Sequence, residues 1–144
     1  MNMNDDELRQ AMGALESYQQ QLDNVTRQVR LLQASRDEAS RADQTFQTLA
    51  ATKAGGQVLV PVGATSFVNV IVAPDTKAIV NIGSQTSTSK DLKDASAFMQ
   101  DSIKEIQGAL SKALAAMQEL QTYTQELGQA VQAEYRARKQ GPTQ

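Results

Sequence analysis

A valine-rich stretch at residues 58–72, VLVPVGATSFVNVIV, divides this sequence into two long arms. Its many β-branched residues favour strands, and Gly63-Ala-Thr-Ser66 in the middle of the stretch favours a turn. After the turn, valines alternate with other residues in the two-residue period of a strand. The residues before this stretch, and those after about residue 90, follow a helical pattern instead. We therefore expect one compact β insert between two helices.

The first arm, residues 4–54, carries the heptad spacing of a coiled coil, although Arg36 and Asp43 interrupt it. Asn4 can cap the helix, and the acidic residues 5–7 suit its positive N-terminal end. The seam positions hold Leu8, Leu15, Leu22 and Val29 in one set, and Ala11, Tyr18, Val25, Leu32, Ala39 and Phe46 in the other. Gly55-Gly56 predicts the helix end, because glycine adopts the left-handed conformation that often follows a helix.

The second arm, residues 90–139, repeats this spacing up to Gly141-Pro142. Thr88 and Asp91 have the spacing of a capping box, which predicts that the helix begins near residue 89. The seam positions are Leu92, Met99, Ile106, Ala113, Leu120 and Leu127 in one set, and Ile103, Leu110, Met117 and Val131 in the other. Because the two arms have similar lengths, we expect them to pair antiparallel as one long hairpin of helices.

Residues 57–89, between the arms, are long enough for two β-hairpins. A turn at 73–76 separates the valine-rich pair from a third apolar run at 77–82. A polar stretch at 85–89, rich in serine and threonine, is expected to form the fourth strand. Pro61 lies inside the first strand, and since proline has no N–H to donate, it predicts a strand edge or a bulge there.

The apolar residues of these hairpins predict assembly with other chains. Two hairpins alone are marginally stable in water, and their exposed apolar edges would invite aggregation. The residues expected to meet neighbouring subunits are Val58, Leu59, Val60, Val62, Phe67, Val68, Val70, Ile71, Val72, Ile79, Val80 and Ile82. Pairing with hairpins of other chains would close a shared sheet or barrel. The alternative is a small sheet that packs only on the bases of its own two helices.

The predicted fold is thus a single domain, residues 1–144, of the α+β class and mainly α. It is a long antiparallel two-helix coiled coil with a central two-hairpin β insert, which is expected to assemble with other subunits into a shared sheet or a β-barrel. Antiparallel pairing brings Asp5-Asp6-Glu7 beside the basic residues Arg136, Arg138 and Lys139 at the free end. Each such exposed ion pair contributes only about 0–1 kcal/mol.

The composition argues against an enzyme. Cysteine and histidine are absent, which removes thiol and imidazole catalysis and the usual zinc ligands. No glycine-rich nucleotide-binding motif is present, and the carboxylates are scattered over helix faces, so we expect no cofactor and no metal. A net charge of −2 and 4% aromatic residues argue against nucleic acid as a partner. No apolar run suits a signal peptide or a membrane span, so a soluble, cytoplasmic protein is expected.

Apolar residues near the ends of the two arms suggest a surface that binds partner proteins. Seam residues become partly exposed where two helices fray, and flexible methionines adapt to unrelated partners. The residues predicted to form this surface, which would bind clients in a chaperone, are Met1, Met3, Leu8, Met12, Leu15, Leu127, Val131 and Tyr135. The alternative is that these residues only complete the seam and an unstructured terminus. Leu31 and Leu114 also lie outside the seam, as a mid-arm patch or as a sign of a register shift.

The insert resembles the prefoldin family, alpha class, whose strand–turn–strand carries an L-V-P-[LV]-G-x-x-S-F pattern. Here the pattern is Leu59-Val60-Pro61-Val62-Gly63 followed by Ser66-Phe67. Ile79-Val-Asn-Ile-Gly83 is similar to the next strand, and Asp94-Ala95…Phe98-Met99 to the entry of the second arm. The arm lengths fit over the whole chain. The departures are the unusually polar 85–89 strand and glutamine-rich arms.

The resemblance implies an ATP-independent molecular chaperone. Its expected form is a hexamer of two alpha and four beta prefoldin subunits, in which hairpins build a β-barrel platform and six coiled coils extend from it. The arm tips would hold unfolded client polypeptides and pass them to a group II chaperonin. Several weak apolar tips around one cavity would bind through multivalency, which needs no catalytic chemistry. A non-chaperone coiled-coil adaptor that docks folded partners stays the alternative.

Overall fold

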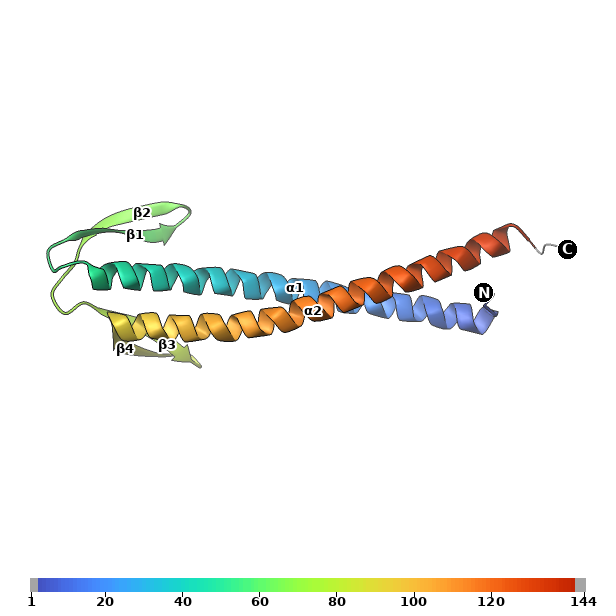
Figure 1. Ribbon diagram of the computed structural model, residues 1–144, viewed down its shortest axis with the longest axis horizontal. Coiled ribbons are helices and arrows are strands. Elements are labelled where there is room, and N and C mark those ends of the chain that lie inside the picture. Colours follow the sequence, from blue (N-terminus) through green and yellow to red (C-terminus); the bar gives the residue numbers. More distant parts are fainter. Residues whose placement is uncertain (1–2, 142–144) are drawn as a thin grey trace. The chain divides into compact units, whose positions relative to one another are not determined.

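The computed structural model describes residues 3–141, which form two long helices and four strands (Figure 1). The elements in chain order are α1 (Asp5–Ala51), β1 (Gln57–Gly63), β2 (Ser66–Ile71), β3 (Lys77–Gly83), β4 (Thr86–Asp91) and α2 (Leu92–Lys139). β1 pairs with β2, and β3 pairs with β4, both antiparallel. The predicted α+β fold with a two-hairpin insert is confirmed.

The chain divides into two compact units, and each helix contributes to both. The terminal unit contains Met1–Leu32 and Ala109–Gln144, and the hairpin unit contains Gln33–Gly108. Every predicted seam position of the two arms is buried or half-buried, which confirms the heptad register. The single domain expected over residues 1–144 stays a prediction.

Asn4 caps α1 in the terminal unit, as predicted. Its Oδ1 accepts a hydrogen bond of 2.8 Å from the backbone N–H of Glu7, and its Nδ2 donates to the Glu7 side chain at 3.2 Å. The first of these bonds satisfies one of the free N–H groups of the first helical turn, and the second holds the two side chains together. The start of α1 is therefore fixed by local sequence.

Small and branched seam residues form the core of the terminal unit. Val29 from α1 packs with Leu110 and Ala113 from α2, and all three are at most 6% exposed. Val25, Leu32 and Met117 extend this cluster. Nearer the chain termini, the rings of Tyr18 and Tyr123 lie 5.7 Å apart at a tilt, a favourable aromatic geometry. The two helices thus pack through a narrow apolar stripe.

The hairpin unit has its own core between β3 and the two helices. Ala78 and Val80 of β3 are buried with Leu92 and Ala95 of α2. Four larger side chains pack against this cluster: Phe46, Leu49, Phe98 and Met99. The inner face of the β3–β4 hairpin therefore lies directly on the start of α2.

A polar pair replaces apolar packing at one seam level of the hairpin unit. Asp43, 9% exposed, accepts a hydrogen bond from the hydroxyl of Ser96, 8% exposed. Gln47 also donates to Asp43 at 2.9 Å. Because Ser96 donates from the facing helix, its bond to the buried Asp43 carboxylate forms only when the helices keep this axial alignment.

Both hairpins turn through two-residue loops whose residues all have positive φ. Ala64 and Thr65 join β1 to β2, and Ser84 and Gln85 join β3 to β4, with φ between 45° and 63°. This is the geometry of hairpin turns that match the twist of the strands. The register shifts between Pro61 and Gly63, which confirms the irregularity predicted at the proline.

The predicted start of the second helix is wrong by two to three residues. Thr88 and Asp91 lie in β4 rather than in a capping box, and α2 begins at Leu92. Asp91 pairs with Lys77 of β3, and their charged groups are 3.5 Å apart. Continued strand pairing therefore takes these residues out of the helix. The polar fourth strand expected at 85–89 is confirmed and runs from 86 to 91.

α1 ends at Ala51, slightly before the predicted position. Gly55 donates its N–H to the carbonyl of Val72 at 2.8 Å, and Val72 donates to the carbonyl of Gly56 at 2.9 Å. A Cβ on Gly56 would stand 2.5 Å from Cγ2 of Thr52. The two glycines therefore join the helix end to the first hairpin, in addition to ending the helix.

Candidate functional site

The apolar hairpin residues divide into a buried set and an exposed set. Val58, Val72 and Val80 are 2–6% exposed, and Val60 and Val70 are half-buried. The exposed set comprises seven residues with 47–79% of their surface open: Leu59, Val62, Phe67, Val68, Ile71, Ile79 and Ile82. We call these seven the hairpin surface.

The expectation that all twelve residues face partners is therefore wrong for the buried three. On β3 the cause is the alternation of a strand, which turns Ala78 and Val80 to the helices and Ile79 to the opposite face. Ile79 is 79% exposed while its neighbour Val80 is 2% exposed. The chain covers one face of this hairpin and leaves the other face open.

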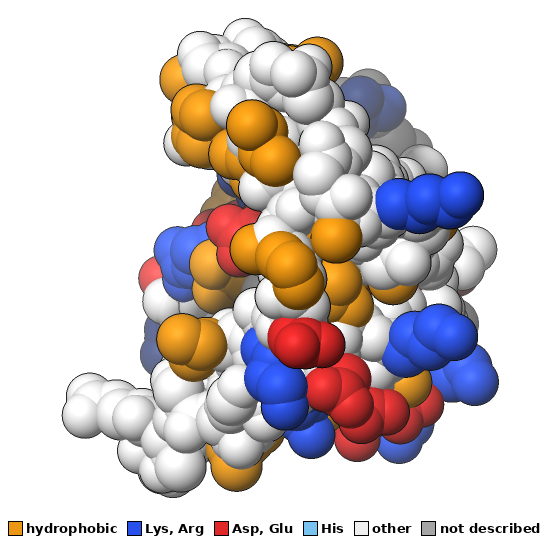
Figure 2. Space-filling view, turned by 90° about the vertical axis from the view of Figure 1, so that its left-hand side faces the viewer, with side chains coloured by type: hydrophobic (Ala, Val, Ile, Leu, Met, Phe, Trp, Pro, Cys, Tyr) orange, Lys and Arg blue, Asp and Glu red, His pale blue; other side chains and the backbone are white. Residues whose placement is uncertain are grey.

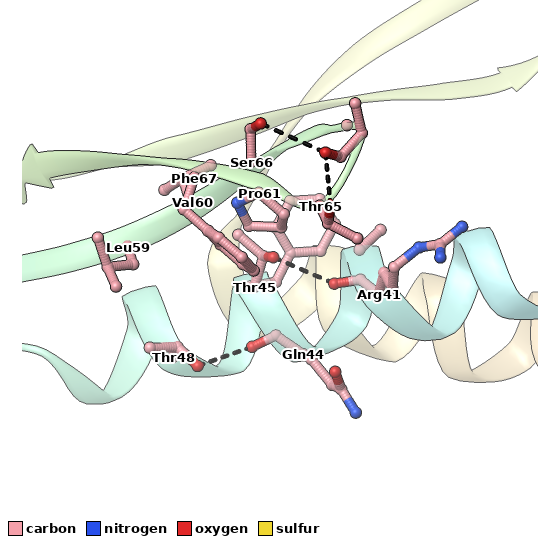
Figure 3. A pocket seen from close by; sticks show the side chains of 14 residues that line it. Arg41, Gln44, Thr45, Thr48, Leu59, Val60, Pro61, Thr65, Ser66 and Phe67 are labelled. Atoms are coloured by element: carbon pink, nitrogen blue, oxygen red, sulfur yellow. Dashed lines mark hydrogen bonds between the residues drawn. The ribbon is translucent and has the colours of Figure 1, made fainter.

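The β1–β2 hairpin stands over α1 with an open cleft of about 770 Å³ between them (Figure 3). Leu59, Pro61 and Phe67 line it from the hairpin, and Thr45 and Phe46 line it from α1. Figure 2 views the molecule from the end that carries the hairpins, where several hydrophobic side chains are visible. A largely apolar cleft of this kind can accept side chains or a strand from another molecule.

The terminal unit places the predicted client-binding residues in different environments. Met12 and Tyr135 are 43% and 46% exposed, and the Tyr135 hydroxyl lies 3.1 Å from the Met12 sulfur. Leu15, Leu127 and Met3 are half-buried, while Met1 lies outside the described residues. The expectation of partial exposure is wrong for Leu8 and Val131, which are 7% and 6% exposed because the seam stays packed to its end.

Three hydrogen bonds tie Met3 and Asp5, the first residue of α1, to the last turns of α2, and a fourth joins two residues within α2. The Arg138 guanidinium donates to Asp5 Oδ1 at 2.7 Å, to the carbonyl of Met3 at 3.0 Å and to Glu134 Oε1 at 3.0 Å. Glu134 Oε2 accepts the Met3 N–H at 3.1 Å. We call Met3, Asp5, Glu134 and Arg138 the tip clasp. It confirms that opposite charges meet at this end, through Arg138 and Asp5.

The clasp perturbs the acidity of its members. The Met3 N–H, followed by the Arg138 guanidinium, lowers the pKa of Glu134 below its ordinary value, because both stabilise the carboxylate. Asp5 and then Glu134 raise the pKa of Arg138. Both groups therefore keep their charges at neutral pH.

Glu134 was not among the residues predicted for the site, although its position in the sequence indicates a role. It lies seven residues after Leu127, at the next position of the same seam set, and is 5% exposed. Ser96 similarly lies seven residues before Ile103 and meets the seam residue Asp43. Asp43 and Ser96 thus meet across the two helices, whereas Glu134 binds Met3 before α1 and Arg138 of its own helix, and the spacing alone names none of these partners.

Within residues 3–141 no group of three or more acidic, histidine or cysteine side chains could hold a metal ion. Among these residues no helix combines the length and apolar character needed to cross a membrane.

Comparison with known proteins points to one family. The profile of the prefoldin subunit family matches residues 18–137. The prefoldin subunit alpha of Methanoculleus marisnigri is 29% identical over 88% of this chain and 84% of its own length. That of Methanobrevibacter smithii is 32% identical over 77% of this chain and 75% of its own length. A chain of the filamentous PFD from Methanocaldococcus jannaschii, 24% identical, shares the fold with a TM-score of 0.61, over 80% of this chain and 95% of that one.

Proposed function

This chain belongs to the prefoldin family as an alpha-class chaperone subunit, and we propose that its hairpin surface builds the oligomer while its arm tips hold clients. The proposed oligomer is a hexamer of two alpha and four beta subunits around a β-barrel platform. The clients are unfolded polypeptides, which the tips hold without ATP and release to a group II chaperonin. This sequence of events takes place in the cytoplasm.

The observation that carries the proposal is the hairpin surface. Seven apolar strand residues with 47–79% of their area exposed are unusual for a chain that works alone. Each sheet has only two strands, so every strand also has an unpaired edge. Hairpins from neighbouring subunits would cover the apolar side chains and pair the edges in one step.

The tip supports client binding through a small, adaptable apolar surface. Met12 and Tyr135 remain accessible, and Leu15 nearby is half-buried. Gly128 has no side chain; a Cβ at that position would lie 4.0 Å from Cδ1 of Leu15. One such patch is too small for tight binding of an extended chain. Several tips of one oligomer, acting together, raise the effective concentration and hence the affinity.

A pair of surface variants tests the assignment of the tip. Met12→Ser combined with Tyr135→Ser removes the two exposed tip side chains, whereas Leu31→Ser removes an apolar side chain that is 70% exposed elsewhere in the terminal unit. The assembled oligomer is mixed with reduced, carboxymethylated lactalbumin, a permanently unfolded chain, and binding is followed by fluorescence anisotropy. We expect weaker binding for the tip variant only. Equal binding by all three proteins would reject the tip as the client site.

A non-chaperone adaptor that docks folded partners is the second candidate. The two candidates differ in what the oligomer does to an aggregating protein. A chaperone suppresses light scattering by a thermally unfolding enzyme without added ATP, and an adaptor leaves the scattering unchanged. Transfer is tested in the same assay by adding a group II chaperonin with ATP, which should restore enzyme activity only when the client was first held.

A further inference from the structure

We propose that Leu8 and Val131 form a concealed client-binding site, and that the tip clasp is its displaceable cover. The inference rests on the proposed function, because it adds a second, hidden part to the client surface of the tip. Leu8 and Val131 are apolar and suited to binding an unfolded chain. They are also the last strongly buried apolar residues at this end of the terminal unit, 7% and 6% exposed.

The clasp lies one helical turn from each of these residues. Asp5 precedes Leu8 by three positions, and Glu134 follows Val131 by three, so each clasp residue shares a helix face with a concealed one. Arg138 connects the two sides by bonding Asp5 of α1 and Glu134 of α2. Closing the clasp therefore holds the first turn of α1 against α2 where Leu8 and Val131 are buried.

The clasp can open without unwinding a helix. Met3 lies before the start of α1. Its N–H donates to the side chain of Glu134, and its carbonyl accepts from the side chain of Arg138, both of α2. The Arg138 side chain is itself 38% exposed and the Asp5 side chain 81% exposed. Water can replace these partners one at a time, whereas the packed seam below the clasp has no such route.

The composition of the clasp also suits a cover rather than a permanent seal. Glu134 is the strongly buried member of the clasp, and it accepts hydrogen bonds from the Met3 N–H and from Arg138. The first bond breaks when the residues before α1 move away, and the second breaks when the Arg138 side chain rotates. An apolar segment that enters would replace the contact between the helices with contacts to itself. Met12 and Tyr135, already exposed, offer the first contact, and Leu8 and Val131 add apolar area after opening.

Charge-neutral variants of the clasp test the cover. Arg138→Gln and Glu134→Gln each remove charge-assisted hydrogen bonds, and Arg136→Gln removes a charge two residues away that makes no ion pair within residues 3–141. In the full chain, assembled with its partner subunits, amide exchange near residues 6–11 and 128–133 should accelerate about tenfold in the clasp variants only. Unchanged exchange in Arg138→Gln would overturn the inference.

Client binding supplies the second readout. The same clasp variants should bind reduced, carboxymethylated lactalbumin several-fold more tightly than the unaltered oligomer, because less of the binding free energy is spent on opening. Adding Leu8→Ala to Arg138→Gln should abolish that gain. Faster exchange without tighter binding, or a gain that survives Leu8→Ala, would overturn the concealed site.

A covalent lock tests the opposite direction. The chain has no cysteine, so Asp5→Cys with Arg138→Cys reacts with a short bismaleimide only at the clasp. The linked oligomer should bind the unfolded chain several-fold more weakly than the same variant blocked with N-ethylmaleimide, and equal binding counts against the inference. Failure of the proposed function looks different, since it leaves binding unchanged in the Met12→Ser, Tyr135→Ser variant.

Discussion

Two adjacent residues of β3, Ile79 and Val80, should give opposite results when each is shortened to alanine. Val80 is 2% exposed and packs against the start of α2, whereas Ile79 is 79% exposed. Shortening Val80 should therefore destabilise the chain itself. Shortening Ile79 should weaken the association between chains and leave the single chain nearly unaffected.

The size of each effect follows from the burial. Val80→Ala removes two buried methyl groups at about 0.8 kcal/mol each and leaves a cavity, for a loss of about 2–3 kcal/mol in unfolding free energy. Ile79 has buried only about one fifth of its surface, so Ile79→Ala should cost the single chain about 0.5 kcal/mol. If a neighbouring subunit buries the rest, the association loses about 2 kcal/mol, or roughly 30-fold in Kd.

Urea unfolding of the isolated chain, followed by circular dichroism, measures the first quantity. Sedimentation of the chain with a beta-class partner measures the second. Ser89→Ala is the matched control, because Ser89 lies directly opposite Ile79 in the β3–β4 ladder and is exposed. The reasoning is refuted if Ile79→Ala destabilises the isolated chain as much as Val80→Ala, or if it leaves assembly unchanged.

Four further changes test the helical parts of the chain. Thr124→Val should stabilise the chain by about 1 kcal/mol in thermal unfolding, because the buried hydroxyl of Thr124 has no hydrogen-bond partner within the described chain. Asp43→Ala should destabilise it by about 1–3 kcal/mol in urea, since Ser96 then loses its buried acceptor. Gly13→Ala should add about 1 kcal/mol, because no atom lies within 4 Å of the new methyl group; unchanged or reduced stability would contradict this. Because folding lowers the pKa of Glu134, its carboxylate stabilises the fold at pH values above the ordinary pKa of 4.5, and this stabilisation is lost as the pH falls through the lower pKa of the folded state. An acid titration of Glu134→Gln should lack that loss.

Much of the helical architecture could be predicted from the sequence, because its causes are local or periodic. Asn4 caps α1 through a hydrogen bond to a residue three positions away. The heptad positions are buried because a repeat of this period places them on one stripe of the helix. The partners of polar seam residues could not be predicted in the same way. The spacing marked Asp43 as an interruption of the seam but did not identify Ser96 as its hydrogen-bond donor.

The β insert shows where pattern alone was insufficient. Val58 to Val72 looked apolar on both faces, and no local rule distinguishes a valine that the chain covers itself from one that it leaves open. The start of α2 shows the same limit. Thr88 and Asp91 have the spacing of a cap, but Asp91 pairs with Lys77, and the capping motif could form only if that pairing were absent.

The sequence by itself therefore determined the two helices, their register, the two hairpins and the family, all of which depend on residue type and spacing. Only the tertiary structure decided which apolar residues remain available. It buried Val80 and left Ile79 open, it buried Leu8 and Val131 in the seam, and it joined Met3, Asp5, Glu134 and Arg138 in the tip clasp. The physical reason is that exposure depends on what other segments cover a side chain, and those segments are far away in the sequence.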